Sequence, residues 1–200
     1  MPAPVTIVLA SGNAGKIREL AALLRPLNVT VVPQSDYGVT EADETGQTFA
    51  ENALLKARHA HAATGLPAIA DDSGLSVAAL DGRPGVRSAR YAGEQASDDE
   101  NIDKLLAELN GVADRRAAFH CAACFVAGDD DQPLTGQGVW HGEILTARRG
   151  TGGFGYDPVF FDAAFGLSSA ELTAEQKNAR SHRGQALRQL AEALALRYPG

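Results

Sequence analysis

The N-terminal stretch of the chain constrains its fold most strongly. An apolar run over residues 5–10 gives way to small, turn-forming residues in "SGNAGK", and apolar side chains then recur at helical spacing with Ile17, Leu20 and Leu24. This order predicts a buried strand, a tight turn and a helix over residues 14–24. A strand that passes directly into a helix is typical of α/β proteins.

The remaining pattern extends this start into a mixed sheet. Further strands are predicted at residues 29–32, 68–70, 117–127 and 138–145, and further helices at residues 48–63, 97–109 and 181–197. Two of these helices open with a capping-box pattern, Thr48 with Glu51 and Ser97 with Glu100. Strands and helices alternate early, but the last two long strands follow one another directly. The central sheet is therefore expected to be mixed rather than purely parallel.

The length and net charge of the chain indicate a single-domain protein and argue against a nucleic-acid-binding protein. The chain has 200 residues and no segment that resembles a linker, so residues 1–200 are expected to form a single domain. The net charge of −7 argues against a nucleic-acid surface that depends on phosphate attraction. No apolar stretch approaches the roughly 20 residues that span a bilayer, and no signal peptide is recognisable. We expect a cytoplasmic protein that binds neither nucleic acid nor membrane.

Cys121 and Cys124 form a CxxC pattern, which is found in zinc sites and redox proteins. The surrounding sequence "RRAAFHCAACFVAG" predicts a buried strand, in which residues three apart point to opposite faces. Two thiols on opposite faces cannot share a metal ion, and the chain has no second CxxC. Structural burial is the expected role of both cysteines.

Lys16 is predicted in the first turn of a helix, where the positive end of the helix dipole disfavours a cation. The stretch around it resembles a P-loop, but that motif has four residues between its first glycine and Gly-Lys, whereas two separate Gly12 from Gly15. Small residues still let backbone N–H groups approach an anion, whose charge Lys16 would neutralise. A tight turn with a solvated lysine explains the stretch equally well.

Two acidic stretches could carry chemistry. In "AIADDSG" a short strand is predicted to end in Asp71 and Asp72, which point to different sides while the chain stays extended. One carboxylate could bind magnesium or orient water, although Asp-Asp-Ser-Gly is also ordinary turn chemistry. In "EADETGQTFAEN", Asp43 or Glu44 near Asp72 would form a magnesium site completed by substrate phosphates. A solvated acidic surface is the alternative for this second stretch.

Two further stretches lie near the C-terminus. The glycines of "GTGGFGYDP" would allow close approach of a ligand and stacking of an aromatic ring on it, or the aromatics could instead fill the core. In "KNARSHRGQAL", His182 and Arg183 fall in the first turn of the last helix, again against the dipole. One anion shared by Lys16 and these two residues would explain both unfavourable placements.

Taken together, five stretches resemble the inosine triphosphate pyrophosphatase family, the non-canonical purine nucleoside triphosphate pyrophosphatases of the HAM1 type. The matching stretches are "SGNAGKIREL", "ETGQTFAENALLKARHA", "ADDSGLSVAALDGRPGVRSARYAG", "GTGGFGYDPVFF" and "SHRGQAL". The resemblance implies an elongated mixed sheet flanked by helices, two lobes with a nucleotide cleft between them, and a homodimer. It implies hydrolysis of ITP, dITP and XTP to the monophosphate and pyrophosphate with Mg²⁺, which removes deaminated purines from the nucleotide pool.

The resemblance also implies roles for particular residues. Asp72 would be the general base that activates water, and it would bind the metal together with Asp43 or Glu44. The residues expected to bind the substrate are Ser11, Gly12, Asn13, Ala14, Gly15, Lys16, Ser73, Phe154, Gly155, Tyr156, Asp157, Lys177, His182 and Arg183. Relatives carry Glu-Glu before Thr-Gly where this chain has Asp43-Glu44, which leaves the identity of the second metal ligand open.

Selectivity against ATP would depend on the purine 6-position, where a carbonyl accepts a hydrogen bond and an amine donates one. Donors from His182, Arg183 or the backbone would remain unpaired when they face the amine. Two other hypotheses are compatible with the sequence: a related pyrophosphatase that prefers another nucleotide, such as a modified pyrimidine, and a nucleotide-sensing module without activity. Retention of both Asp71 and Asp72 weighs against the sensor, because a pure binder needs no base beside the phosphates.

Overall fold

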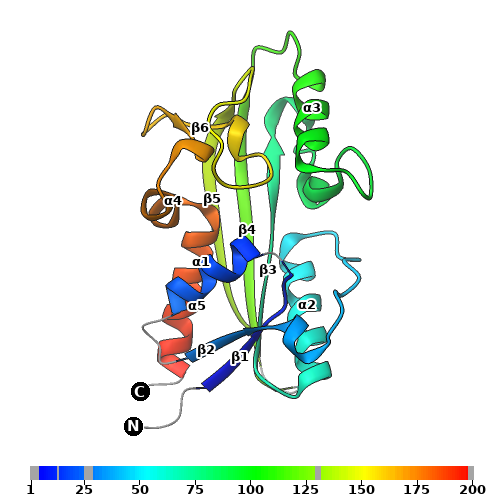
Figure 1. The fold of residues 1–200 in the computed structure, drawn as a ribbon, viewed down its shortest axis with the longest axis vertical. Helices are drawn as coiled ribbons and strands as arrows, with labels where there is room; N and C mark the ends of the chain where they lie inside the picture. Colours follow the sequence, from blue (N-terminus) through cyan, green and yellow to red (C-terminus); the bar gives the residue numbers. More distant parts are fainter. Residues whose placement is uncertain (1–4, 13, 25–28, 129–131, 198–200) are drawn as a thin grey trace. The chain divides into compact units, whose positions relative to one another are not determined.

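The computed structural model describes residues 5–12, 14–24, 29–128 and 132–197 (Figure 1). Contacts divide the chain into two compact units. The first unit comprises residues 1–72, 121–138 and 183–200, and the second comprises residues 73–120 and 139–182. Strands β3, β4 and β5 each contribute residues to both units.

The strands of the described residues form a seven-stranded sheet in the order β2-β1-β3-β4-β5-β6-β7. The strands are β1 (Val5–Leu9), β2 (Val29–Pro33), β3 (Ala68–Val77), β4 (Arg116–Val126), β5 (Leu134–Ile144), β6 (Phe160–Asp162) and β7 (Leu167–Ser168). β1 pairs in parallel with β2 and β3, whereas β6 pairs in antiparallel fashion with β5 and β7. The prediction of a mixed α/β sheet is confirmed.

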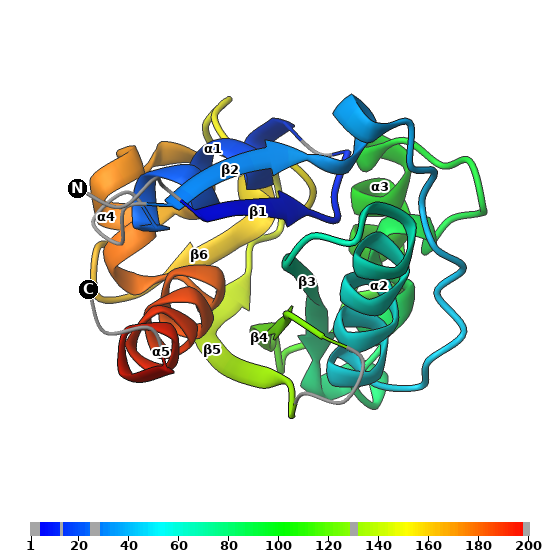
Figure 2. The ribbon, with the colours of Figure 1, turned by 90° about the horizontal axis from the view of Figure 1, so that it is seen from below.

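Helices cover both faces of the sheet in the first unit. These helices are α1 (Ala14–Leu24), α2 (Phe49–Thr64) and α5 (His182–Arg197). Figure 2 shows α2 and α5 on opposite sides of β3. Apolar residues of α1 and α5 form one core cluster, and Ala53, Ala57 and Ala60 of α2 form another with the opposite face of the sheet. These three alanines are completely buried, and their small size lets α2 approach the sheet closely.

The second unit has its own core. Helix α3 (Asp98–Glu108) contributes Ile102 and Leu105, which join the aromatic rings of Phe119, Trp140 and Phe160. A shorter helix, α4 (Ala174–Arg180), begins after the cap residue Thr173 and was not predicted. Its sequence cue is a capping box with Gln176 rather than the more usual Glu.

The predicted helix boundaries are correct to within about one residue. The side chains of Thr48 and Ser97 cap α2 and α3, and each accepts a hydrogen bond from the backbone N–H three residues later at 3.2 Å. Both capping boxes are complete. None of the helices among the described residues is long and apolar enough to span a membrane.

Two strand predictions were wrong in extent. β3 continues to Val77 instead of ending at Ala70, because Leu75 and Val77 are completely buried in the core of the second unit. The turn chemistry of Asp-Asp-Ser-Gly is overridden by this tertiary packing. β5 begins at Leu134 instead of Gly138. A Cβ on Gly136 would lie 2.0 Å from the carbonyl oxygen of Ala186 in α5, so this glycine allows helix and strand to meet rather than marking a loop.

Both cysteines are free and buried. Cys121 belongs to the core cluster with α1 and α5, and Cys124 belongs to the cluster with α2. Burial raises the pKa of both thiols, that of Cys124 to about 11. The two side chains thus point to opposite faces of β4, as the strand alternation predicts.

Candidate active site

Asp72 is the centre of a buried polar cluster in the first unit. It lies in the middle of β3 with 6% of its surface exposed. Its Oδ1 accepts a hydrogen bond from Nζ of Lys56 at 2.8 Å, and the same ammonium donates to Oε1 of Glu44 at 2.9 Å. Two carboxylates therefore converge on one cation, which projects from α2.

Asn52 holds the other oxygen of Asp72. Its Nδ2 donates to Oδ2 of Asp72 at 3.2 Å, while its Oδ1 accepts from the backbone N–H of Gly46 at 2.8 Å. Asn52 is completely buried, and a Cβ on Gly46 would lie 2.6 Å from its Oδ1. Glycine at position 46 thus lets the acidic segment before α2 reach Asn52, which links that segment to Asp72.

The surroundings of Asp72 shift its pKa upward. Burial raises the pKa of Asp72, and the nearby carboxylate of Glu44 adds to this effect, while the Lys56 ammonium opposes it. Burial lowers the pKa of Lys56, but the carboxylates of Asp72, Asp71 and Glu44 outweigh burial and raise it. A carboxylate whose pKa is raised toward neutrality is a better proton acceptor than an ordinary aspartate.

Asp71 points to the opposite face of β3 and holds two cations. Nζ of Lys16 lies 2.9 Å from its Oδ2, and Nε of Arg183 lies 3.2 Å from the same oxygen. Lys16 belongs to the first turn of α1, and Arg183 to the first turn of α5. The predicted opposite orientation of the two aspartates is confirmed by their separate partners.

The charges of Lys16 and Arg183 determine the protonation of Asp71. Burial alone would raise the pKa of Asp71, but the two cations outweigh it and hold this pKa far below its ordinary value. An aspartate in such a state is a poor proton acceptor, so of the two aspartates Asp72 is the one suited to act as a base. Two of the three residues that were expected to share an anion, Lys16 and Arg183, thus contact one carboxylate of the protein, whereas His182 stacks on Phe119.

The predicted phosphate loop connects β1 to α1. Ala10 is buried, and the backbone N–H of Ser11 donates to the carbonyl of Leu9 at 2.9 Å. Gly12 is exposed, and a Cβ there would lie 3.1 Å from Oε1 of Glu41, so the absence of a side chain lets Glu41 lie close to the loop. Asn13 lies outside the described residues; Ala14 and Gly15 begin α1.

A second cluster surrounds Asp157 in the second unit. Its Oδ2 accepts from Nζ of Lys177 at 2.6 Å and from the backbone N–H of Phe154 at 2.9 Å. Its Oδ1 accepts from the hydroxyl of Ser169 at 2.7 Å. The ammonium of Lys177 also lies 5.0 Å from the centroid of the Phe154 ring. A cation and an aromatic ring are thereby held together by one buried carboxylate.

The remaining predicted residues of this unit differ in their surroundings. The ring of Tyr156 is buried in the core and its hydroxyl donates to the carbonyl of Ser88, which favours the packing alternative for this side chain. His182 is buried and stacks on Phe119 with ring centroids 4.8 Å apart. The backbone N–H of Gly155 donates to Asp98 at 2.7 Å. Ser73 lies on β3 and is partly exposed.

The candidate metal ligands are not equally placed. Glu44 shares the Lys56 ammonium with Asp72, whereas the Asp43 side chain is exposed. Among the described residues no group of three or more His, Cys, Asp or Glu side chains could hold a metal ion by itself. Mg²⁺ is typically bound by one or two carboxylates together with waters and substrate phosphates. The carboxylates of Asp72 and Glu44 match this coordination.

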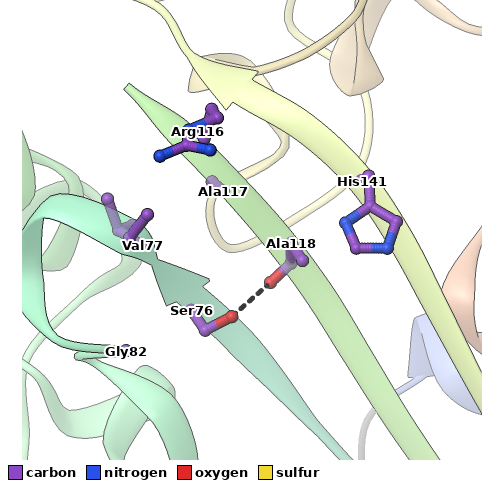
Figure 3. A pocket seen from close by; sticks show the side chains of 8 residues that line it. Ser76, Val77, Gly82, Arg116, Ala117, Ala118 and His141 are labelled. Atoms are coloured by element: carbon purple, nitrogen blue, oxygen red, sulfur yellow. Dashed lines mark hydrogen bonds between the residues drawn. The ribbon is translucent and has the colours of Figure 1, made fainter. Parts of the chain in front are cut away.

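A pocket of about 290 Å³ lies elsewhere, within the second unit. It is lined by Ser76, Val77, Ala78, Gly82, Arg116, Ala117, Ala118 and His141. Figure 3 shows Arg116 and His141 on neighbouring strands, with the hydroxyl of Ser76 donating to the carbonyl of Ala118. The pocket contains no residue predicted from the sequence, and its guanidinium is already paired with Asp114 at 2.7 Å.

Sequence reasoning missed Asn52 and Lys56. They lie four residues apart on α2, a spacing that puts both on one face of the helix. The sequence feature that could have indicated them is a pair of polar residues on a helix whose alanines pack against the sheet. Its meaning depends on Asp72, which is distant in sequence, so the helix pattern alone could not reveal it.

Comparisons with known proteins give a consistent result. A model of the Ham1 family matches residues 7–193. A dITP/XTP pyrophosphatase of Pectobacterium atrosepticum is 56% identical over 191 residues, which cover 94% of this chain and 97% of that protein. A dITP/XTP pyrophosphatase of Methylococcus capsulatus is 59% identical over 191 residues, with coverage of 94% and 95%. The solved structure of a HAM1 protein from Coxiella burnetii has a TM-score of 0.89 and 50% identity, and the match covers 96% of this chain and 99% of that chain.

Proposed function

The chain belongs to the Ham1 family, and from this premise we propose that it hydrolyses dITP, ITP and XTP to the nucleoside monophosphate and pyrophosphate. The reaction would remove deaminated purines from the nucleotide pool. The observation that carries the proposal is the environment of Asp72: a buried carboxylate with a raised pKa that is fixed by Lys56 and Asn52.

Asp72 is the general base in this proposal. It accepts a proton from the attacking water, and the hydrogen bonds from Asn52 and Lys56 fix the orientation of its two oxygens. Lys16 and residues 11–15, which lead into α1 and form its start, bind the triphosphate, because the N-terminal N–H groups of a helix favour an anion. Asn13 and Ala14 are assigned to the triphosphate by family resemblance alone.

The charges of the cluster indicate why a divalent cation is needed. Lys16, Lys56 and Arg183 carry three positive charges, which the carboxylates of Asp71, Asp72 and Glu44 cancel. A triphosphate brings about four more negative charges, which positioned cations must screen before a nucleophile can approach. We assign Mg²⁺ to Asp72 and the acidic pair Asp43 and Glu44; when bound, the ion supplies charge stabilisation to the phosphates.

Family resemblance assigns the purine and sugar to the stretch around Phe154 and to the start of α5. Phe154 offers an aromatic face beside the ammonium of Lys177, and His182 is held flat against Phe119. Gly155, Tyr156, Asp157, Ser73 and Arg183 complete the residues assigned to this part of the substrate. Donors from His182 and Arg183 would favour a 6-carbonyl over a 6-amine, because an amine would leave these donors unpaired.

A panel of nucleoside triphosphates tests the proposal directly. With Mg²⁺ present, dITP and XTP should yield monophosphate and pyrophosphate, and ATP should remain intact. Asp72→Asn should lower kcat by about 10²- to 10⁴-fold, the usual contribution of a general base, while Asp114→Asn on the surface should behave as wild type. Preferential cleavage of a modified pyrimidine would contradict the substrate assignment. Tight nucleotide binding without turnover at any metal concentration would instead indicate a sensor.

The metal assignment has its own readout. The Mg²⁺ concentration that gives half-maximal rate should rise in the variant that removes the second ligand, either Asp43→Asn or Glu44→Gln. Direct Mg²⁺ titration by calorimetry in the presence of an inert triphosphate analogue should show weaker Mg²⁺ binding in the same variant. Wild-type behaviour of both variants would contradict the assignment of this acidic pair.

We further propose that residues 1–200 act as one two-lobed domain, that the protein is a homodimer, and that it acts in the cytoplasm. These proposals rest on family resemblance. Light scattering coupled to size-exclusion chromatography tests the dimer, since a chain of 20.9 kDa should elute with twice that mass. A monomer at micromolar concentration would contradict it.

A further inference from the structure

Asp71 has no role in the reaction steps above, yet it is one of the most buried charged residues of the first unit. Its exposed fraction is 4%, and its Oδ2 is the common acceptor for Lys16 and Arg183. The thiol of Cys121 lies 3.9 Å from the same oxygen. The carboxylate is thus enclosed by two cations and a buried core residue.

The two cations come from distant parts of the chain. Lys16 lies near the start of α1 and Arg183 near the start of α5, both at helix ends where the dipole disfavours positive charge. Neither helix has an acidic residue in its own first turn to compensate. The Lys16 side chain is 16% exposed and that of Arg183 4%, so water provides little compensation either. Asp71 is the carboxylate that both side chains contact.

We infer that Asp71 is a positioning residue, whose carboxylate fixes the ammonium of Lys16 and the guanidinium of Arg183 in the arrangement that binds the substrate's phosphates and nucleoside. The inference rests on the proposed function for the roles of those two cations. Asp71 occupies the place of the anion that would otherwise be needed to hold two cations together. The side chains of Lys16 and Arg183 are then oriented before the triphosphate binds, so binding costs little additional side-chain entropy.

Electrostatics alone predicts the opposite sign of effect, which makes the inference testable. Asp71→Asn removes a negative charge next to Lys16, the cation assigned to the phosphates, and next to Arg183, so Coulomb attraction by itself would tighten the binding of a polyphosphate. If Asp71 acts by positioning, the same variant weakens binding, because the two cations lose their common acceptor. The direction of the change therefore separates the two explanations.

The experiment measures binding of Mg²⁺-tripolyphosphate by calorimetry, together with kcat and KM for dITP. Asp71→Asn should weaken tripolyphosphate binding and raise KM by about 10- to 100-fold, with a smaller change in kcat, as expected when oriented groups are misplaced. Asp71→Glu restores the charge and should recover at least part of both losses. In a Lys16→Gln background, Asp71→Asn should have a smaller effect on tripolyphosphate binding than in wild type, because one of its partners is already absent.

Asp162→Asn is the matched control. Asp162 is also a buried carboxylate, 1% exposed, and accepts from Arg180 and from the indole N–H of Trp140 in the second unit. Loss of stability should accompany both variants, whereas tripolyphosphate binding should fall only in the Asp71 variant. If Asp71→Asn does not fold, Asp71→Glu and the Lys16→Gln background provide the comparison.

The outcomes separate this inference from the proposed function. If wild-type protein leaves dITP and XTP intact but Asp71→Asn still loses tripolyphosphate binding and Asp71→Glu recovers part of it, the substrate assignment fails and the positioning role stands. Unchanged or tighter tripolyphosphate binding in Asp71→Asn overturns the positioning role, whether or not dITP is cleaved. Failure of the wild-type protein to bind tripolyphosphate at millimolar concentration also overturns it, because Asp71 then has no anion-binding cations to position.

Discussion

Asp157→Asn is expected to destabilise the second unit much more than a similar change on the surface. The Asp157 carboxylate is 3% exposed and accepts hydrogen bonds from Lys177, Ser169 and the N–H of Phe154. With the amide oxygen at the Oδ2 position, Asn could keep the bonds from Lys177 and Phe154, and its NH₂ group could donate to Ser169. The main loss is then the negative charge opposite an ammonium that is only 12% exposed.

The magnitude follows from this geometry. Removal of one partner from a buried ion pair costs about 3–5 kcal/mol, and the partial exposure of Lys177 reduces this to about 2–4 kcal/mol. For a chain of this size each kcal/mol lowers Tm by roughly 2–4 °C, so the melting temperature should fall by about 4–16 °C. Exposed ion pairs contribute about 0–1 kcal/mol. Asp103→Asn, which removes an exposed partner of Arg148, is therefore the matched surface control.

The assay is urea unfolding followed by the fluorescence of Trp140, the single tryptophan, which is buried in the core of the same unit. The midpoint should fall in Asp157→Asn and change little in Asp103→Asn. In a Lys177→Met background the cost of Asp157→Asn should shrink, because no buried ammonium is left without its counter-charge. If Asp157→Asn costs no more than Asp103→Asn, or costs the same with and without Lys177, the attribution to a buried ion pair is wrong.

Three further predictions concern stability and accessibility. Burial alone would raise the pKa of Asp162, but hydrogen bonds from Arg180 and Trp140 lower it, so the ionised carboxylate stabilises the fold above the unfolded pKa of about 3.9 and this effect is lost as pH falls through the folded pKa. The difference in unfolding free energy between wild type and Asp162→Asn, measured by urea unfolding from pH 7 to pH 3, should therefore shrink at acid pH. Cys121 and Cys124 should react with an aromatic disulfide reagent only when the protein unfolds locally or globally, so the reaction followed by absorbance should be no faster than that unfolding. Rapid reaction of either thiol under native conditions would contradict their burial. Gly136→Ala should destabilise the chain by about 1–3 kcal/mol, as overpacking does, because its Cβ would meet the carbonyl of Ala186; a wild-type midpoint in a thermal melt would mean that α5 shifts freely away from β5.

Local signals in the sequence were sufficient for most helices. The capping pairs at Thr48 and Ser97 correctly marked the starts of α2 and α3, because both partners of each cap lie within one turn of the chain. Helix α1 was predicted with its observed bounds from the spacing of Ile17, Leu20 and Leu24. Such features depend on neighbours in sequence and can be recognised without the rest of the fold.

The extent of β3 could not be predicted in the same way. Asp71, Asp72 and Ser73 have the composition of a turn, and nothing local indicates that the strand continues through them. Burial of two adjacent carboxylates in a strand is tolerated only when each has a cationic partner. Those partners are Lys16, Lys56 and Arg183, up to 112 residues away in the chain. The strand and its polar site therefore depend on the same long-range contacts.

The same contacts change the meaning of the cations at the helix starts. Their unfavourable positions predict an anion, and Asp71 of the protein already provides one for Lys16 and Arg183. The positions of these cations therefore do not by themselves require a phosphate. The stronger argument for a catalytic site is Asp72, a second carboxylate that Lys56 holds and whose pKa is raised by burial. In the proposed site the two adjacent carboxylates have separate tasks: Asp72 activates water, and Asp71 positions Lys16 and Arg183, the cations assigned to the substrate.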